Sequence, residues 1–548
     1  MLASSNDSNN EDDGSFDLEE RDWRAFRARL VQQEQDQQST SASPTTRLSL
    51  NDDSTVTRWA YDAGMNIEVG TVLLSIPTTD LCQALEQQYF HRCACLITHC
   101  DNENGVKGIL LNRPTAFMYK AADDDFEWSL WFGGNMYENH IDDDSEITCL
   151  HSLTSLQAKN VSTVIERGLY FTNLARARTL VKKKLAKPKD FWCFGGHCKW
   201  FPGQLEQEMG PERGEWFGVS MDAATILEQL RQQELAGATA GLDMWELFVD
   251  RIDKHEEALS RIPRGQLRFY DRMLQAWVNS NLVLASDEVT ANITSSKANL
   301  GPGTIVRARV KGKDGTTCPP FLLSEQDFHR SLVLVLSDDE TASIGVHLNL
   351  PLSGVIEISD TIRLPIRYGG PTDPEETNDE EAFVWIHRSR ALQKAGEGTP
   401  LGKSGFSTIK EDDAVEALHS GKASPDDFMI FSGICIWEKD EDFGLVGGGL
   451  AEQVQELESM EVVSSNKAGT IWNLLNRQEV LTSDTLESNI DIAIASWEAA
   501  SDEDDNVANE ENAAVAEDLL LADAALRAWA AVSLLDEPTT TLIEVPEG

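Results

Sequence analysis

Runs of branched apolar residues early in the chain predict β-strands. Three such runs are GTVLLSIP (70–77), CACLITH (93–99) and VKGILLNRP (106–114), and residues of this kind favour strands. The last two flank the turn-forming sequence DNENG (101–105). We therefore expect two strands joined by a turn at this point.

Helical segments follow these strands. The patterns RARTLVKKKL (176–185) and MDAATILEQLRQQ (221–233), and the apolar segment around Trp245, are typical of helices. Further along, SLVLVL (331–336) and IGVHLNL (344–350) again predict two strands, joined by DDETAS. Strands interleaved irregularly with helices indicate an α+β protein rather than a regular βαβ fold.

The order of the motifs indicates that one unit occurs twice. FGGHCKW (194–200) returns as FSGICIW (431–437), with Phe, Gly, Cys and Trp in the same places. Six further pairs follow the same order: Gly70 to Leu73 with Gly303 to Val306, Phe90-His91-Arg92 with Phe328-His329-Arg330, Gly108 to Pro114 with Gly345 to Pro351, Gly133-Gly134 with Gly369-Gly370, His151 with His387, and Gly168 with Gly405. The offset stays between 233 (303 minus 70) and 238 (328 minus 90), whereas chance matches would scatter. We infer a tandem duplication of a module.

Each copy continues into helices. Trp245-Glu-Leu-Phe matches Trp472-Asn-Leu-Leu, and the segment from Asp271 matches the segment from Asp523. The offset of the second pair is 252 (523 minus 271). We attribute the increase to an acidic insert, SDEDDNVANEEN (501–512), which is predicted to be a disordered loop.

The predicted organisation has six parts. These are a disordered N-terminus (1–16), an N-terminal helix and linker (17–60), the first module with its helical extension (61–280), a linker (281–300), a second, divergent module (301–480), and an acidic loop with a C-terminal helix (481–548). Within 17–60, four apolar residues recur at helical spacing: Trp23, Phe26, Leu30 and Val31. This spacing indicates an amphipathic helix that packs on a module.

The amino-acid composition gives the chain a strong negative charge. The 548 residues include 46 basic and 92 acidic side chains, which gives a net charge of −46. Such a surface repels phosphate backbones, so we expect no direct binding to nucleic acid. The chain has no run of apolar residues long enough to span a membrane, and no membrane association is expected.

The number of cysteines and the N-terminal sequence indicate the cellular compartment of the protein. Nine unevenly spaced cysteines suit a reducing compartment rather than a disulfide framework. The first twenty residues contain neither an apolar segment typical of a secretory signal nor an Arg-rich amphipathic segment. We expect an intracellular protein of the cytoplasm, and a plastid location of a mature form is the alternative.

The ordered motifs resemble the YqgE/AlgH family. The likeness is carried over 70–220 by Gly-Thr-Val-Leu-Leu, Tyr-Phe-His-Arg, Gly-Ile-Leu-Leu-Asn-Arg-Pro, Trp-Phe-Gly-Gly and the string that runs from FGGHCKW through Gly-Gln-Leu-Glu. It is weaker over 303–450, where Leu350 stands in place of Arg113. The resemblance implies two tandem α+β modules, each a bifurcated mixed sheet folded toward a pseudo-barrel with flanking helices. The family is loosely described as one of transcriptional regulators and supplies no catalytic residue set, since fold does not fix function.

Eight residues are candidates for binding: His91, Arg92, Asn112, Arg113, Gly133, Gly134, His329 and Arg330. The two histidines stand in Phe-His-Arg in both copies, where they could act as acid or base or could bond a backbone group. Arg113 occurs in the first copy alone, and we name it as the first residue to test for anion or partner recognition. The glycine pairs and the Asn-x-Pro elements also have a structural explanation in close backbone approach and strand ends.

An alternative site uses thiols. Cys93, Cys95 and His99 lie at alternate positions of one predicted strand and would share a face. Further ligands of a zinc site could be Cys149, His151, His197 and Cys198. The second copy lacks the strand thiols, and a buried cysteine is a common core residue. Cys198 is matched by Cys435 without a neighbouring histidine, which favours a packed thiol over a nucleophile. We predict no metal and no cofactor.

Two functions remain as hypotheses. The favoured one is a non-enzymatic regulatory or scaffold protein that binds other, unidentified proteins, because the duplicated acidic chain has no complete catalytic constellation. The two modules could pack together as an intramolecular pseudo-dimer. The alternative is a thiol- or zinc-dependent enzyme or redox sensor that uses the Cys and His residues of the first module.

Overall fold

The computed structural model describes residues 24, 27–28, 58–101, 103–121, 124–136, 147–283, 300–310, 326–359, 361–372, 382–439, 449–455, 459–501, 513–535 and 539–542. Most of the predicted N-terminal helix (18–35), of the linker (281–300) and of the acidic segment (501–512) lies outside these residues. The helix, the linker and the disorder predicted for these segments therefore stay predictions.

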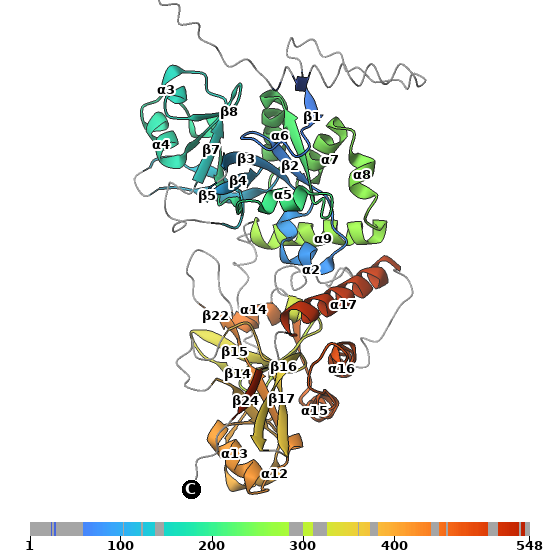
Figure 1. The fold of residues 1–548 in the computed structure, drawn as a ribbon. Coiled ribbons are helices and arrows are strands. Elements are labelled where there is room, and N and C mark those ends of the chain that lie inside the picture. Colours follow the sequence, from blue (N-terminus) through green and yellow to red (C-terminus); the bar gives the residue numbers. More distant parts are fainter. Residues whose placement is uncertain are drawn as a thin grey trace, which may run out of the picture. The chain divides into compact units, whose positions relative to one another are not determined.

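The chain forms two compact units, drawn as ribbons in Figure 1. The first comprises residues 1–76 and 92–258, and the second comprises 77–91 and 259–548. Two parts of the first repeat, residues 77–91 between β2 and β3 and the helical segment from residue 259 onward, thus belong to the second unit. The domain boundaries derived from the sequence stay predictions.

The first unit contains two six-stranded sheets. Its strands are β1 (Ala60–Asp62), β2 (Val72–Ser75), β3 (Ala94–Asp101), β4 (Gly105–Leu110), β5 (Pro114–Tyr119), β6 (Trp128–Phe132), β7 (Ile147–His151), β8 (Thr163–Glu166), β9 (Leu169–Asn173), β10 (Phe191–Gly195), β11 (Cys198–Trp200) and β12 (Trp216–Met221). One sheet has the order β1-β12-β2-β3-β4-β11 and is antiparallel throughout. The other has the order β5-β6-β10-β7-β9-β8 and is mixed, because β6 and β10 are parallel.

The helices of the first unit are α3 (Leu156–Lys159), α4 (Leu174–Lys182), α5 (Gln204–Met209), α6 (Ala223–Ala236), α7 (Leu242–Arg251), the short α8 (His255–Leu259) at the boundary of the unit, and the 3-10 turn η2 (Pro188–Asp190). Three of them, α3, α4 and α6, begin at polar side-chain caps, whereas α5 and α7 begin after glycines. Asp222 caps α6 by accepting a hydrogen bond from Thr225 N at 2.9 Å. Leu174, Ala177 and Leu180 of α4 are buried and form a core with residues of β6, β7 and β10. The helices predicted at 176–185 and 221–233 and around Trp245 are thus confirmed.

The predicted turns close hairpins in both modules. Between β3 and β4, Asp101 accepts hydrogen bonds from the backbone N–H groups of Glu103 and Asn104 at 2.8 and 2.6 Å. In the second module, Asp339 accepts from Thr341 N at 2.8 Å. A side chain that bonds its own backbone two or three residues later stabilises a tight turn. The two-strand predictions are therefore confirmed.

The second unit contains a five-stranded and a seven-stranded sheet. Its strands are β13 (Ile305–Ala308), β14 (Leu332–Asp338), β15 (Ala342–His347), β16 (Pro351–Ser359), β17 (Ile362–Tyr368), β18 (Val384–His387), β19 (Thr399–Pro400), β20 (Ser407–Ile409), β21 (Phe428–Ser432), β22 (Cys435–Glu438), β23 (Met460–Val462) and β24 (Thr539–Leu542). The sheet orders are β22-β15-β14-β13-β23 and β19-β20-β18-β21-β17-β16-β24. Apart from the edge strands β1 and β24, these orders repeat those of the first unit strand for strand.

The helices of the second unit come from both repeats. They are α2 (Leu81–Glu86), η1 (Gln88–Phe90), α9 (Arg264–Asn281), η3 (Gln326–Phe328), α12 (Arg390–Ala395), α13 (Glu411–His419), η5 (Pro425–Asp427), α14 (Gly449–Gln455), η7 (Ser465–Lys467), α15 (Ala468–Leu475), α16 (Leu486–Ala499) and α17 (Ala513–Ser533). Within this unit α17 contacts α2, α9 and α16. One buried core joins β13, β14 and β15 to α15 and α16.

These sheets and helices confirm the predicted α+β fold and the tandem duplication. Each module combines an antiparallel sheet with a mixed sheet, and strands of the antiparallel sheet come both before and after most strands of the mixed sheet in sequence. Among the described strands, neither sheet of a module closes into a barrel. The predicted pseudo-dimer concerns the placement of the modules relative to each other and stays a prediction.

Candidate functional site

A buried asparagine occupies the same place in both repeats. Asn112 accepts a hydrogen bond from Ala94 N on β3 at 3.0 Å. It donates to the carbonyl oxygens of Arg92 and Gly241 at 3.0 and 2.9 Å. Asn349 makes the corresponding three bonds, to β14, to the peptide before β14 and to α16, at 2.8 to 3.1 Å. Each asparagine therefore ties its sheet to the helical part of its module, and the proline that follows it opens the next strand.

The repeated histidines contact the last helix of each repeat. His91 Nε2 lies 2.8 Å from Asp271 Oδ1 on α9. His329 Nε2 lies 2.8 Å from Asp523 Oδ1 on α17. Burial lowers the pKa of His329; burial raises the pKa of Asp523, but its hydrogen bonds from His329 and Arg330 outweigh burial and lower it. The contact confirms the predicted correspondence of the two helices.

The arginine after each histidine stacks on a tryptophan. The Arg92 guanidinium lies 4.7 Å from the ring centre of Trp245 on α7. The Arg330 guanidinium lies 4.7 Å from the ring centre of Trp497 on α16, and both arginines have a positive φ, 49° and 53°. Trp497, and not Trp472, is therefore the counterpart of Trp245, which corrects the sequence alignment. Trp472 belongs to the preceding helix, α15, where it is also buried.

This correction also removes the predicted acidic insert. The distance in sequence from Trp245 to Asp271 is 26 residues (271 minus 245), and that from Trp497 to Asp523 is also 26 (523 minus 497). Segment 501–512 therefore has a counterpart of equal length in the first repeat. The additional residues of the second repeat lie upstream, between β22 and α16.

Each module buries one arginine beneath the loop between its two adjacent helices. Arg113 is fully buried and donates to the carbonyl oxygens of Asn112 and Ala240 at 2.9 and 2.6 Å. Arg367 of β17, at the position of Trp131 in the first repeat (offset 236, 367 minus 131), donates to Gln478 and to the carbonyl oxygen of Leu475. Burial lowers the pKa of both arginines to about 10. The structure thus places Arg113 in the interior, where it contacts backbone.

The glycine pairs accommodate the repeated heptapeptide. A Cβ on Gly134 would lie 2.3 Å from a backbone atom of the facing loop, and one on Gly370 would lie 2.2 Å from the equivalent loop. The buried Cys198 donates its S–H to the carbonyl oxygen of Gly133 at 3.6 Å. Cys435 makes the same contact in the second repeat at 3.4 Å. The string shared by FGGHCKW and FSGICIW therefore maintains a close approach of two backbone segments.

The alternative metal site is not assembled. Cys93 and Cys95 are completely buried, and burial raises the pKa of Cys93 to about 12 and that of Cys95 as well. A β-bulge between Ile97 and His99 breaks the alternation of faces, so His99 lies at the surface and bonds Asp101 at 2.9 Å. Among the described residues, no group of three His, Cys, Asp or Glu side chains could hold a metal ion.

The matched histidines of β7 and β18 are also interior residues. His151 Nε2 lies 2.7 Å from Ser162 Oγ, and its Nδ1 accepts from Leu153 N at 3.2 Å. Burial lowers the pKa of His151 to about 4 and also lowers that of His387. Both imidazoles are therefore neutral at pH 7.

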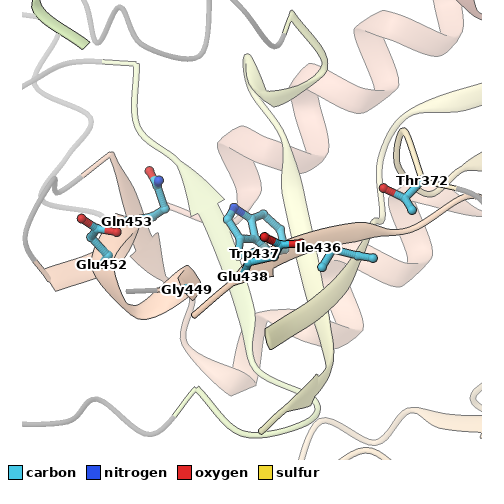
Figure 2. Close-up of a pocket in the computed structure, with 7 residues that line it drawn as sticks. All are labelled: Thr372, Ile436, Trp437, Glu438, Gly449, Glu452 and Gln453. Carbon is cyan, nitrogen blue, oxygen red and sulfur yellow. The ribbon is translucent and has the colours of Figure 1, made fainter. Parts of the chain in front are cut away.

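A solvent-accessible pocket of about 660 Å³ lies between β22 and α14 in the second unit. It is lined by Thr372, Ile436, Trp437, Glu438, Gly449, Glu452 and Gln453. Figure 2 shows Trp437 and Glu438 on the strand and Glu452 and Gln453 on the neighbouring helix. The predicted binding residues do not line this pocket; whether they bind a ligand or partner stays a prediction.

Sequence reasoning missed several of these features. Neither Arg367 nor the pocket was predicted. The proximity of Cys149 to Cys193, whose sulfur atoms lie 3.3 Å apart across β7 and β10, was not predicted either. The sequence contained one signal for Arg367. Leu350 replaces Arg113 in the second repeat, and this loss indicates that another residue, here Arg367, must supply hydrogen bonds to the neighbouring helices. The cysteine pair gave no signal, since its partners are 44 residues apart.

The chain consists of two tandem α+β modules whose sheets have the same strand order. It is therefore a protein in which one domain has been duplicated. The AlgH-like family model matches residues 81–246 and 318–441. The chain therefore belongs to the AlgH-like family, with one match in each repeat, as the sequence motifs predicted.

Two solved structures are similar to parts of the chain. The protein DIP2367 from Corynebacterium diphtheriae is 20% identical, with 38% of this chain and 93% of that chain covered and a TM-score of 0.22. The AlgH protein from Pseudomonas aeruginosa is 16% identical, with 32% and 87% covered and a TM-score of 0.22. A comparison with curated protein sequences gave no match. None of the helices in the described part of the chain has the length and apolar character needed to cross a membrane.

Proposed function

We propose that this chain is a non-enzymatic regulatory or scaffold protein that binds other proteins. The observation that carries the proposal is the use of the same His and Cys side chains for folding contacts in both repeats. His91 and His329 contact an aspartate of the last helix, and Cys198 and Cys435 contact a glycine carbonyl. Residues committed to such contacts are not available as acid, base or nucleophile toward a substrate.

The charge of the chain indicates the kind of partner. A net charge of −46 attracts basic proteins over the range of the Debye length, about 8 Å at physiological salt, and repels nucleic acids. The carboxylates of Glu438 and Glu452 beside a surface pocket fit the same preference. Recognition of a protein with a basic surface is therefore the function that these observations support best.

The thiol-dependent alternative has no supporting observation among the described residues. A reactive cysteine requires a thiolate at neutral pH. Burial raises the pKa of Cys93 to about 12 and raises that of Cys95 too, which keeps both thiols protonated.

Affinity capture of the tagged chain from cells tests the proposal. We expect the same partner proteins in independent captures, and we expect Cys198→Ser to retain them, because the thiol serves packing. Captures that return no reproducible partner would contradict the proposal. So would a partner set that is lost with Cys198→Ser while circular dichroism shows the fold to be intact.

A further inference from the structure

The antiparallel sheet of the second unit ends in an edge that the first unit covers with an additional strand. In the first unit, β1 forms this edge and pairs with β12, with Tyr61 opposite Ser220. Ala63 N extends the pairing by donating to the carbonyl oxygen of Gly218 at 2.7 Å. In the second unit the corresponding sheet ends at β23, and among the described strands none pairs with the outer side of β23. The second repeat thus has no described counterpart of β1.

Strand registers identify β23 as the counterpart of β12. Val219 of β12 pairs with Val72 on β2. Directly after β23, Val463 N donates to the carbonyl oxygen of Ile305 on β13 at 2.8 Å. Val72 and Ile305 correspond at the repeat offset of 233 (305 minus 72), so Val463 stands where the first repeat has Val219.

The backbone of β23 directs hydrogen-bonding groups toward this edge. Val463 bonds β13, and the bonds between antiparallel strands involve every second residue, so the N–H and C=O groups of Val462 point away from β13. Within the described part of the chain, neither group has a hydrogen-bond partner. Val462 stands where the first repeat has Gly218, whose carbonyl oxygen accepts the bond from Ala63, and it is 49% exposed. A strand edge of this kind can accept a further strand.

A pocket of about 310 Å³ adjoins the same edge. Its apolar lining includes Val462, Val463, Ile305 and Ala468, and its lining also includes the charged side chain of Lys403. All of these residues belong to the second unit. A strand added to β23 would therefore place its side chains beside both an apolar cavity and a positive charge.

The first repeat fills the equivalent corner with its own chain. The glycine before β2 and its counterpart before β13 each approach one carbonyl group closely, that of Ile165 and that of Leu401. Beside the first glycine lies Arg24, whose guanidinium bonds the Glu166 carboxylate at 2.9 Å. In the second repeat, the loop after Leu401 carries Lys403, which is exposed and has no carboxylate partner among the described residues. The charge offered at this corner is thus reversed.

We propose that the outer edge of β23 binds an extended segment of a partner protein, which adds to the sheet as an antiparallel strand; this inference rests on the proposed protein-binding function. Main-chain hydrogen bonds supply affinity in this mode of recognition, and alternate side chains supply specificity. The segment carries a carboxylate opposite Val463, on the face that lines the pocket together with Lys403, as β1 places Asp62 opposite Val219. One such carboxylate is compatible with a partner whose surface is otherwise basic, because Lys403 acts only at short range.

Fluorescence anisotropy of the full chain with a labelled peptide tests this inference. The probe is Thr-Arg-Trp-Ala-Tyr-Asp-Ala, the sequence of residues 57–63, because this segment contains the strand that pairs with the same edge in the first repeat. We expect the wild-type chain to bind the probe. A second peptide, methylated at the backbone nitrogen of its last alanine, lacks the donor for the Val462 carbonyl oxygen and should bind at least about tenfold more weakly.

Variants of the chain test the same edge from the other side. Val462→Pro removes the outward N–H group without removing a bond to β13, and it should weaken binding at least about tenfold. Val462→Thr keeps this group and should bind within about twofold of wild type. Lys403→Glu should weaken binding about twofold to fivefold, whereas Lys410→Glu, at another exposed position of the same unit, should not. Circular dichroism verifies that each variant is folded.

The inference is overturned if the unmodified peptide does not bind, if the methylated peptide binds as tightly, or if folded Val462→Pro binds like wild type. A dimer of the chain that Val462→Pro abolishes would assign the edge to a second copy and would also overturn it. If Val462→Pro captures the cellular partners as wild type does, the edge inference fails while the proposed function stands. Loss of capture by every form, wild type included, removes both.

Discussion

Single buried polar residues fasten the helices of each module to its sheets. Arg113 and Asn112 do so through backbone carbonyl oxygens, and neither side chain is exposed. A side chain buried in this way leaves unsatisfied acceptors behind when it is removed. Asn112 and Arg113 therefore contribute to the free energy of unfolding of the first unit.

Replacing Arg113 by leucine, the residue of the second repeat, tests this role. We expect Arg113→Leu to destabilise the first unit by about 1–3 kcal/mol, because the carbonyl groups of Asn112 and Ala240 lose their donor. Urea unfolding measures the change, with Arg251→Leu at an exposed helix position as the control. A stable Arg113→Leu variant would return Arg113 to the list of recognition residues.

The buried thiols give a second prediction. Cys93, Cys95 and Cys198 should resist maleimide at pH 7.5 in the folded chain and react after denaturation, since burial removes access and the pKa of Cys93 is raised to about 12. Cys100 is only partly buried and should react sooner, which provides an internal comparison. Mass spectrometry of the peptides locates the label. Rapid labelling of Cys93 or Cys95 in the native chain would support the thiol-dependent alternative.

The histidine of β7 makes stability depend on pH. Its pKa falls from 6.5 to about 4 on folding, so the unfolded chain binds a proton that the folded chain does not. This contribution to stability is present above pH 6.5 and is lost as pH falls toward 4, by up to about 1.4 kcal/mol per pH unit. Between pH 7 and pH 5, His151→Gln should lose less stability in urea titrations than wild type does. The half-exposed His255→Gln serves as control and should follow wild type; equal losses in all three chains would refute the assignment.

At the scale of elements, a partly buried charge contact holds the last helix of the second repeat. Asp523 of α17 accepts hydrogen bonds from His329 at 2.8 Å and from Arg330 at 2.6 and 2.9 Å. Both donors directly precede β14. The contact therefore fixes α17 to the start of the central sheet.

Removing this carboxylate should loosen α17 more than the sheet. For Asp523→Asn we expect faster amide hydrogen exchange along α17, because the histidine and arginine lose their charged acceptor. Exchange in β14 and β15 should change much less. Asp484→Asn, at an exposed position without a side-chain partner among the described residues, is the control. Unchanged exchange in α17 would show that apolar packing alone holds the helix.

The sequence predicted elements well where a local pattern decides them. The hairpins around Asp101 and Asp339 follow from turn chemistry that a short window contains. The match of Trp245 with Trp472 was wrong because contacts distant in sequence decide it. Trp497 lies against Arg330, and its indole N–H donates to the carbonyl oxygen of Ala308, as that of Trp245 donates to Ser75. The prediction that Cys93 and His99 share one face of the strand was wrong, because β3 has a bulge between Ile97 and His99. The bulge arises from the pairing of β3 with β4, and the sequence of β3 alone does not reveal it.

At the scale of the whole molecule, duplication explains both the constancy and the divergence of the two repeats. Residues that join sheet to helix persist, as Asn112 and Asn349 show. The pocket in the second unit could not be predicted, because its lining residues, such as Thr372, Trp437 and Glu452, are far apart in the sequence. Net charge, in contrast, is a property of composition that requires no knowledge of the fold.

Carbodiimide cross-linking in native extract tests the central claim, that this acidic chain recognises proteins with basic surfaces. The reagent joins a lysine of one protein directly to a carboxylate of another when the two are in contact. We predict a reproducible partner whose lysines are joined to Asp or Glu residues of this chain, and we predict that the cross-links disappear at about 0.5 M salt because screening weakens exposed charge pairs. Absence of a reproducible partner, or cross-links that persist unchanged at high salt, would contradict the account.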